Sequence, residues 1–296
     1  MKATWQRIPP TMKGMILLVL AGAMFSCMHG TIRLVSGGPT STEGLHPFEI
    51  AFFRNIFGLV VLLPLLWNVG FSTLRTTRFS LHLTRAVLQV FSMMMFFSAL
   101  KISPLADATA LSFLAPLFAT IGAILFLGEK AKIRRWTALA VGFAGALIIL
   151  RPGFQEISLG LVLVMGASAI WGGAMLIIKS LAKTDSSISI AAYMGILMTP
   201  MSLIPALYVW RTPTPEEFVG LFIIGAFGSI GHVMLAQAFK EAEATAILPL
   251  DFTRLIWAAI VGYLLFAEVP GLWTWVGGGL IFSAATYVAY RETRQN

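Results

Sequence analysis

Residues 99–129, ALKISPLADATALSFLAPLFATIGAILFLGE, contain the stretch that decides the fold of this chain. Its apolar part, about 105–127, is long enough to cross a lipid core, which takes about 20 residues. Short connections rich in Gly, Pro and Ser separate it from similar runs on both sides. Because lipid offers no water to backbone groups and the runs lack strand alternation, they predict an all-α membrane protein with ten transmembrane helices. The ten runs lie at about 14–35, 48–67, 83–100, 105–127, 136–150, 159–178, 188–209, 218–239, 244–266 and 272–290.

The composition excludes other classes of protein. Of the 296 residues, 57% are hydrophobic and 11% are charged, whereas a soluble domain is about 25% charged. So few polar groups cannot cover a soluble surface, which excludes a soluble enzyme, a disordered chain and a nucleic-acid-binding domain. Sequence motifs for a metal site, a catalytic serine or a nucleotide loop are missing. We therefore expect no enzyme activity, no cofactor, no metal and no nucleic-acid partner.

The basic residues predict the orientation in the membrane. Alternate connections hold about fourteen Lys and Arg on one side and about three on the other, which places the richer side and both termini in the cytoplasm. An even number of spans also requires the termini to share one side. The net charge of +8 is therefore a topology signal, and we expect a multi-pass protein of a bacterial-type inner membrane. The single cysteine, Cys27, excludes an intrachain disulfide.

The deciding stretch recurs about 139 residues later in the chain. Because each copy holds five spans, an odd number, the second copy is expected to lie upside down relative to the first. The predicted units are residues 14–150, with spans one to five, and residues 159–290, with spans six to ten. Inverted repeats are the architecture of alternating-access transporters, whose site lies at the midplane between the halves. The matching pairs are Ala99 with Ala238, Lys101 with Lys240, Leu111 with Leu250, Phe113 with Phe252, Leu125 with Leu264, Glu129 with Glu268 and Trp136 with Trp275.

These residues carry a family resemblance. Residues 99–129 closely resemble the end of an EamA domain, the unit that builds the drug/metabolite transporter superfamily, and residues 238–268 resemble it more weakly. The segment LHPFEIAFFR at 45–54 looks like the second span of the S-adenosylmethionine importers and riboflavin importers of this group. The resemblance implies ten helices in two inverted five-helix EamA repeats, a central cavity and cytoplasmic termini. Known members export amino acids and other metabolites or import cofactor-like molecules.

Ionisable groups inside lipid are costly, so each is a candidate for function. Asp251 and Arg254 share one face of the ninth span at spacing i,i+3, where they either bound the substrate cavity or lock the span to a neighbour. Arg54 lies about 9 Å into the second span, where it either binds an anionic group of the substrate or bridges helices together with Asn55. Arg85, at the start of the third span, is expected to snorkel to lipid headgroups.

Further polar and aromatic side chains lie within the apolar runs. His29 and His232 suit proton coupling, and the alternative is that each is a hydrogen-bonded packing residue. Gln89 is expected to donate between helices. Trp171 and Trp257 lie in the middle of their spans, where they either stack on a flat ring of the substrate or pack between helices.

Together these features predict a secondary transporter of a small organic metabolite. The preferred substrate is a cofactor-like aromatic compound, riboflavin or S-adenosylmethionine, taken inward. The first alternative is export of amino acids or related metabolites, and the second is a lipid-linked flippase or a non-transporting membrane scaffold. Small-residue faces at 142–145 and 277–279 pack the halves together or form a homodimer. Substrate identity, direction, coupling ion and oligomeric state do not follow from the sequence.

Overall fold

The computed structural model describes residues 8–38, 44–127, 133–150, 158–181, 184–241, 250 and 253–293. Within these ranges the protein is helical and contains no strand, as the long apolar runs predict. The elements are α2 (Pro10–Val35), α3 (Pro47–Val69), the 3₁₀ helix η1 (Phe71–Leu74), α4 (Phe79–Ile102), α5 (Leu105–Ser112), α6 (Ala115–Leu127), α7 (Ile133–Leu150), α8 (Leu159–Leu181), α9 (Ser187–Tyr208), α10 (Pro215–Glu241), α12 (Thr253–Phe266) and α13 (Leu272–Thr293).

Six of these helices are long and apolar enough to cross a membrane, so the protein is a multi-pass membrane protein. They are Pro10–Val35, Pro47–Val69, Phe79–Ile102, Leu159–Ile178, Ile188–Tyr208 and Pro215–Leu235. Shorter apolar helices occupy Leu139–Leu150, Thr253–Phe266 and Leu272–Ala284, with another over Leu105–Ala119. The number of ten spans remains a prediction.

The predicted fourth span differs from the expectation of one continuous helix. It is divided into α5 and α6, which are separated by Phe113 and Leu114. The amides of these two residues bond to the carbonyls of Ala110 and Leu111, three positions back, so the last turn of α5 is tightened. Pro116 then lacks the amide that would continue α5, and proline suits the first turn of a new helix. The sequence contained this signal in its Ala-Pro-Leu step.

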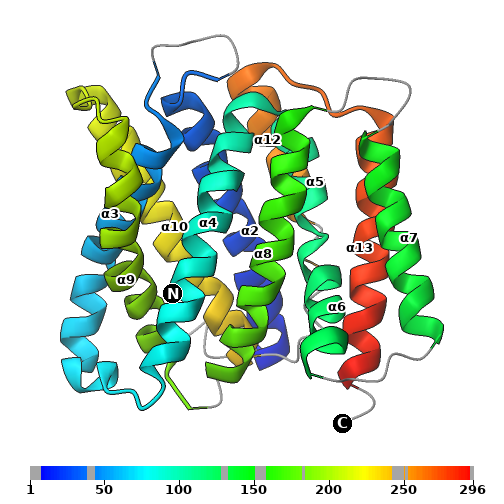
Figure 1. The fold of residues 1–296 in the computed structure, drawn as a ribbon, viewed down its shortest axis with the longest axis horizontal. Helices are drawn as coiled ribbons and strands as arrows, with labels where there is room; N and C mark the ends of the chain where they lie inside the picture. The colour runs from blue at the N-terminus through cyan, green and yellow to red at the C-terminus, as the bar shows by residue number, and fades with distance from the viewer. Residues whose placement is uncertain are drawn as a thin grey trace.

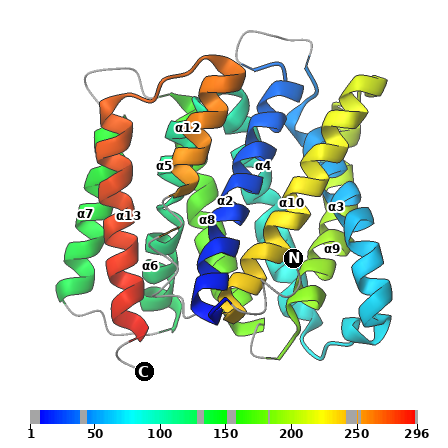
Figure 2. The same cartoon turned by 180° about the vertical axis from the view of Figure 1, so that it is seen from behind.

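The closest helix pairs join the first half of the chain, α2–α7, to the second half, α8–α13. They are α2 with α10, α4 with α8, α3 with α9 and α7 with α13. In span numbers these are one with eight, three with six, two with seven and five with ten, so the pairs are related by exchange of the halves. Figure 1 and its reverse view, Figure 2, show α2 and α8 running in opposite directions. This pairing agrees with two structurally related halves, and the inverted repeat stays a prediction.

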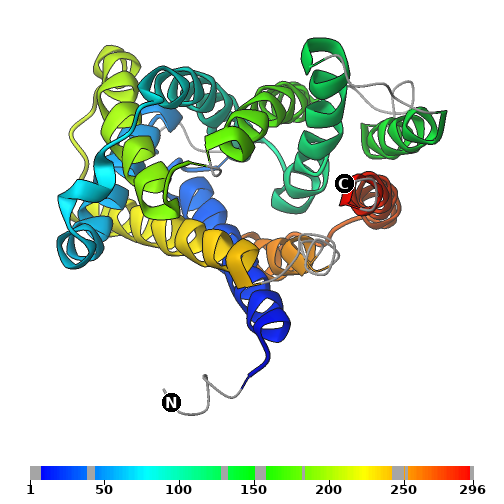
Figure 3. The same ribbon diagram turned by 90° about the horizontal axis from the view of Figure 1, so that it is seen from below.

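The glycines of α7 and α13 face each other inside the chain. A Cβ on Gly145 would lie 2.6 Å from the Gly277 carbonyl oxygen, and one on Gly277 would lie 2.5 Å from the Gly145 carbonyl oxygen. Seen from below in Figure 3, α7 and α13 form a pair at one side of the bundle. These glycines therefore pack the last span of one half against the last span of the other, and the homodimer stays a prediction.

The two ends of the bundle are named here by their connections. The basal end, at the bottom of Figure 1, carries residues 70–78 and the turn at 184–186. The distal end carries residues 36–38 and 44–46, 103–104, 209–214 and 267–271. The polar groups described below lie at these two ends and between them.

Candidate functional site

Arg54 is held inside the bundle by a network that crosses three helices. Its side chain is buried, and Nη1 donates to Oδ1 of Asn55 at 3.0 Å. Asn55 in turn donates to Oγ of Ser202 on α9 at 3.1 Å. Gly228 on α10 leaves the space for the guanidinium, because a Cβ there would lie 3.2 Å from Arg54 Nε. The interhelical bridge expected for Arg54 and Asn55 is present, and the proposed contact with substrate is untested.

His232 on α10 has its ring tautomer set by its own helix. Nδ1 lies 2.8 Å from the Gly228 carbonyl oxygen, and a carbonyl only accepts, so Nδ1 carries the proton. Nη2 of Arg54 lies 3.4 Å from the same nitrogen, which therefore has no lone pair to offer the guanidinium. In the neutral ring Nε2 is the nitrogen that accepts a hydrogen bond. Phe25 of α2 packs its ring against the His232 ring at 5.0 Å between centroids.

His29 lies on α2 close to these groups. Its ring packs edge-on against Phe96 of α4 with centroids 5.0 Å apart. Nδ1 is buried and has no hydrogen-bond partner among the described residues. Arg54, Arg254 and His232 all lie within electrostatic range of His29. The two histidines predicted from separate runs therefore share one environment.

Arg85 and Gln89 lie one turn apart on α4 and face α9. Arg85 is buried rather than snorkelling to lipid headgroups, so that expectation is wrong; Nη1 donates to the Ile190 carbonyl at 3.0 Å. Gln89 donates to the Met194 thioether sulfur at 3.0 Å, as an interhelical donor. Within the described residues, Arg85 Nε and Gln89 Oε1 have no partner. A residue at the end of a span points inward or outward according to its helix face, which position along the span does not reveal.

Arg254 lies at the start of α12, beside the break between α5 and α6. Its Nη2 donates to Ser112 Oγ at 3.3 Å, and its guanidinium lies 4.9 Å from the centre of the Phe113 ring. A cation is stabilised at this position by the C-terminal dipole of α5. The Arg254 carbonyl also accepts from Ser26 Oγ of α2 at 3.2 Å. Asp251, the predicted partner of Arg254, lies outside the described residues.

The two tryptophan candidates lie on different helices of the second half. Trp257 lies one turn after Arg254 and packs next to Gly22 of α2. A Cβ atom added to Gly22 would lie 3.7 Å from Cδ1 of the Trp257 ring. Trp171 is half-buried on α8. The next residue, Gly172, lies against the start of α6, because a Cβ there would be 2.6 Å from the Ala115 carbonyl oxygen. The Trp257 contact fits the packing alternative, while both alternatives for Trp171, and stacking of either ring on a substrate, remain predictions.

Five of these side chains form one group, which we call the basic cluster. Arg54 interacts electrostatically with Arg85 and with His232. His29 interacts electrostatically with both Arg54 and Arg254. The first half contributes α2, α3 and α4, and the second half contributes α10 and α12. The members of the basic cluster are His29, Arg54, Arg85, His232 and Arg254.

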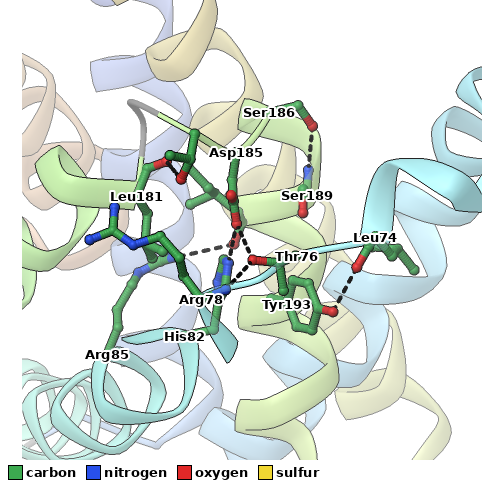
Figure 4. Close-up of polar contacts among 12 residues, drawn as sticks. Leu74, Thr76, Arg78, His82, Arg85, Leu181, Asp185, Ser186, Ser189 and Tyr193 are labelled. Atoms are coloured by element: carbon green, nitrogen blue, oxygen red, sulfur yellow. Dashed lines mark hydrogen bonds and ion pairs between the residues drawn. The ribbon is translucent and has the colours of Figure 1, made fainter. Parts of the chain in front are cut away.

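A histidine and a carboxylate join the two halves at the basal end. His82 Nε2 on α4 lies 2.7 Å from Asp185 Oδ2, and Thr76 Oγ1 donates to the same oxygen at 2.8 Å. Figure 4 shows both side chains converging on Asp185 at the turn before α9, with Tyr193 beside His82. Tyr193 stacks on His82 at 4.4 Å and donates to the Leu74 carbonyl at 2.7 Å. We call Thr76, His82, Asp185 and Tyr193 the basal clamp.

The basal clamp sets the ionisation of Asp185. Burial by itself raises the pKa of this carboxyl, but hydrogen bonds from His82, Thr76 and Thr184 outweigh burial and bring the pKa below its ordinary value. The carboxylate side chain is 6% exposed. Sequence reasoning did not find this pair, because the two residues are 103 positions apart and each lies at the edge of an apolar run.

An ion pair joins the halves at the distal end. Arg33 Nη1 on α2 lies 2.6 Å from Glu268 Oε2, and the Arg33 guanidinium lies 4.5 Å from the centre of the Phe266 ring. The same carboxylate oxygen accepts from the Leu105 amide at the start of α5 at 3.2 Å. A cavity of about 160 Å³ adjoins Glu268 and Asp107. We call Arg33 and Glu268 the distal pair.

Comparison with known proteins places these features in context. The profile of the EamA-like transporter family matches residues 12–151 and again 158–290. An S-adenosylmethionine uptake transporter of Rickettsia bellii is 35% identical over 250 residues, 84% of this chain and 86% of that protein. A riboflavin transporter of Vibrio cholerae is 32% identical over 292 residues, 96% of this chain and 95% of that protein.

Two further similarities cover nearly the whole chain. A pseudopaline exporter of Pseudomonas aeruginosa is 30% identical over 288 residues, 95% of this chain and 97% of that protein. A protein with a solved crystal structure matches with a TM-score of 0.63 and 16% identity over 94% of this chain and 98% of that chain. The last similarity concerns the fold alone.

Proposed function

Because the chain belongs to the EamA-like transporter family, we propose that it is a secondary transporter that imports a cofactor-like aromatic compound, riboflavin or S-adenosylmethionine. The protein is a membrane transporter, and its relatives include proteins named for uptake of each compound. Import through an inner membrane, the substrate and its site are the parts that we propose.

The observation that carries the proposal is the basic cluster, to which both halves contribute. When one half moves against the other, the distances between the residues of the basic cluster change. The affinity for a molecule bound among these residues therefore depends on which end of the protein is open. Arginine offers hydrogen bonds to carbonyl and carboxylate oxygens. The rings of Phe25, Phe96 and Phe113 touch members of the cluster and supply flat apolar surface for an aromatic ring.

The contacts between the halves at the two ends support a gating scheme. The distal pair and the basal clamp each connect the first half to the second half, on opposite sides of the basic cluster. In the proposed cycle one connection breaks while the other holds, which exposes the cluster to one side at a time. The excess of basic residues in the predicted cytoplasmic connections supports a basal end that faces the cytoplasm.

Complementation tests substrate and direction together. The gene is expressed in a riboflavin auxotroph that lacks its own importer, and growth is followed at limiting riboflavin, with membrane expression checked by immunoblot. Rescue supports riboflavin import. In the parallel assay, cells take up radiolabelled S-adenosylmethionine, and uptake there without riboflavin rescue supports the second substrate.

Export is the second candidate, and the similarity to a pseudopaline exporter favours it. Alternating access is reversible, so the direction depends on gradients and coupling rather than on the shape of the site. Proteoliposomes loaded with labelled amino acids or related metabolites measure this alternative directly. Efflux from them, combined with no uptake of either cofactor-like compound, would favour export.

A further inference from the structure

We infer that the basic cluster selects against substrates with a net positive charge, so that the transported compound carries hydrogen-bond acceptors or negative charge where it meets Arg54 and Arg85. This inference rests on the proposed function and narrows it. It favours an uncharged flavin over a sulfonium cation as the molecule that the site binds.

The first step of the argument is where the described carboxylates lie. Glu268 is paired with Arg33 at the distal end, and Asp185 is paired with His82 at the basal end. Glu49, at the start of α3, accepts from the backbone amides of His46 and Arg211. Asp107, in the first turn of α5, accepts from Thr274 Oγ1, and Glu217, in the first turn of α10, pairs with Arg211. These acidic groups lie at the ends of the bundle and at helix starts.

The second step concerns the buried arginines that lie between the two ends of the bundle. Arg54 and Arg85 are each 4% exposed, and among the described residues neither forms a salt bridge with a carboxylate. Arg85 Nε and His29 Nδ1 are buried without a hydrogen-bond partner there. Burying a cation without a counter-ion is costly, so a bound group that supplies acceptors stabilises this arrangement.

The third step is the charge balance with Asp251 included. Its position is outside the described residues, but it contributes at most one negative charge. The basic cluster contains three arginines, so among its own members and an ionised Asp251 the positive charges outnumber the negative ones. A substrate cation would add to this excess at close range, where the low dielectric strengthens repulsion.

The candidate substrates differ in net charge. A flavin ring is uncharged and presents carbonyl oxygens and ring nitrogens, which accept from guanidinium groups. S-adenosylmethionine has a sulfonium in addition to its ammonium and carboxylate, so it bears one net positive charge. S-adenosylhomocysteine has nearly the same shape without the sulfonium, and it has no net charge.

Two matched pairs of compounds test the inference, one pair built on the flavin scaffold and one on the S-adenosyl scaffold. Uptake by purified full-length protein in proteoliposomes is measured for riboflavin against 5′-amino-5′-deoxyriboflavin, and for S-adenosylhomocysteine against S-adenosylmethionine. On whichever scaffold is transported, we expect the compound without net charge to be taken up about tenfold better, because the cluster repels the added charge. Equal or better uptake of the cation would overturn the inference and leave the proposed function intact.

Failure of the proposed function has a different signature. If none of the four compounds is taken up by protein that is monodisperse and helical by circular dichroism, the substrate class itself is wrong, and this inference falls with it. Uptake of either scaffold keeps the function and leaves only the charge preference to be decided.

Variants then locate the preference in the cluster. Arg85→Gln removes one positive charge and keeps a hydrogen-bond donor, and we expect the ratio between the paired compounds to fall to about threefold or less. Arg75→Gln, at an exposed arginine of the basal end, is the matched control and is expected to keep the ratio. The ratio is taken within each variant, so it does not depend on the amount of active protein. An unchanged ratio in both Arg85→Gln and Arg54→Gln would overturn the assignment of selectivity to these arginines.

Discussion

Buried charges occur in two kinds of place in this molecule, and the difference between them separates closure from recognition. At the two ends, a carboxylate of the second half directly contacts a basic side chain of the first half, as Glu268 contacts Arg33 and Asp185 contacts His82. In the middle, Arg54 and Arg85 are equally buried, but among the described residues their acceptors are the side-chain amide of Asn55 and the backbone carbonyl of Ile190. A pair that is complete holds two segments together. A cation with neutral neighbours has capacity left for a ligand that brings acceptors or charge.

The largest effect is expected from removing Arg54. Arg54→Gln keeps a donor for Asn55 and removes the charge, so a charge-assisted bond to the substrate worth about 1.5–3 kcal/mol is lost. This corresponds to a fall of about 10- to 100-fold in the initial rate of substrate uptake. The measurement is uptake by cells with equal amounts of protein in the membrane, and Arg75→Gln serves as the control. Normal uptake by the Arg54 variant would make the residue a helix bridge and remove the contrast between middle and ends.

The distal pair should produce the next largest effect, of a different kind. Glu268→Gln leaves Arg33, which is 4% exposed, without its carboxylate, and removing one partner of a buried pair costs about 3–5 kcal/mol. Because the Glu268 side chain is 24% exposed, we expect about half of this cost. The distal end should then open more often, and a cysteine placed at Ala259, beside the cavity, should react faster with a membrane-impermeant maleimide.

The matched control for the distal pair exchanges the charges. Arg33→Glu combined with Glu268→Arg restores opposite charges and should bring maleimide labelling at position 259 back toward the original rate. Labelling is compared in a Cys27→Ser background so that one thiol reports. If labelling in Glu268→Gln equals that of the parent, the distal pair does not close this end.

A smaller effect, dependent on pH, is expected at the basal clamp. The pKa of Asp185 is lowered in the folded protein, so this group adds stability above its unfolded pKa, and the contribution is lost as pH falls through the folded pKa. At neutral pH, Asp185→Asn should reduce stability by about 1–3 kcal/mol, as expected for hydrogen bonds to a charged group. Thermal unfolding in detergent measures the difference, which should shrink as the pH is lowered. A difference that is constant with pH would show that Asp185 acts by packing.

The apolar runs could predict the helical fold because run length and the scarcity of charge are set by lipid itself. They also led to His29, Arg54, Gln89, His232 and Arg254, since a polar residue inside such a run stands out. Whether these residues meet depends on how five helices are arranged, and no spacing within one run contains that information.

Other features could not be read from runs alone. The basal clamp joins residues at the edges of two runs, where charged and polar residues are ordinary, so neither partner stands out by itself. The break between α5 and α6 was hidden by a continuous apolar stretch, although Pro116 marked it. Arg85 was assigned to the lipid interface from its position near a span end, whereas the face of α4 on which it lies turns it toward α9.

The smallest effect is expected at Gln89, which tests whether charge rather than polarity distinguishes the middle of the molecule. Gln89 lies in the same region and one turn from Arg85, but its amide is uncharged, and within the part of the chain that the structure describes it donates to a thioether, a weak acceptor, and its carbonyl oxygen has no partner. Gln89→Met removes that bond together with an unpartnered carbonyl oxygen, and we expect substrate uptake to change by about threefold or less. The assay is the same as for Arg54→Gln, at equal protein in the membrane. A loss as large as that of the Arg54 variant would mean that the middle recognises its substrate through neutral hydrogen bonds, and the contrast with the paired ends would then concern polarity instead of charge.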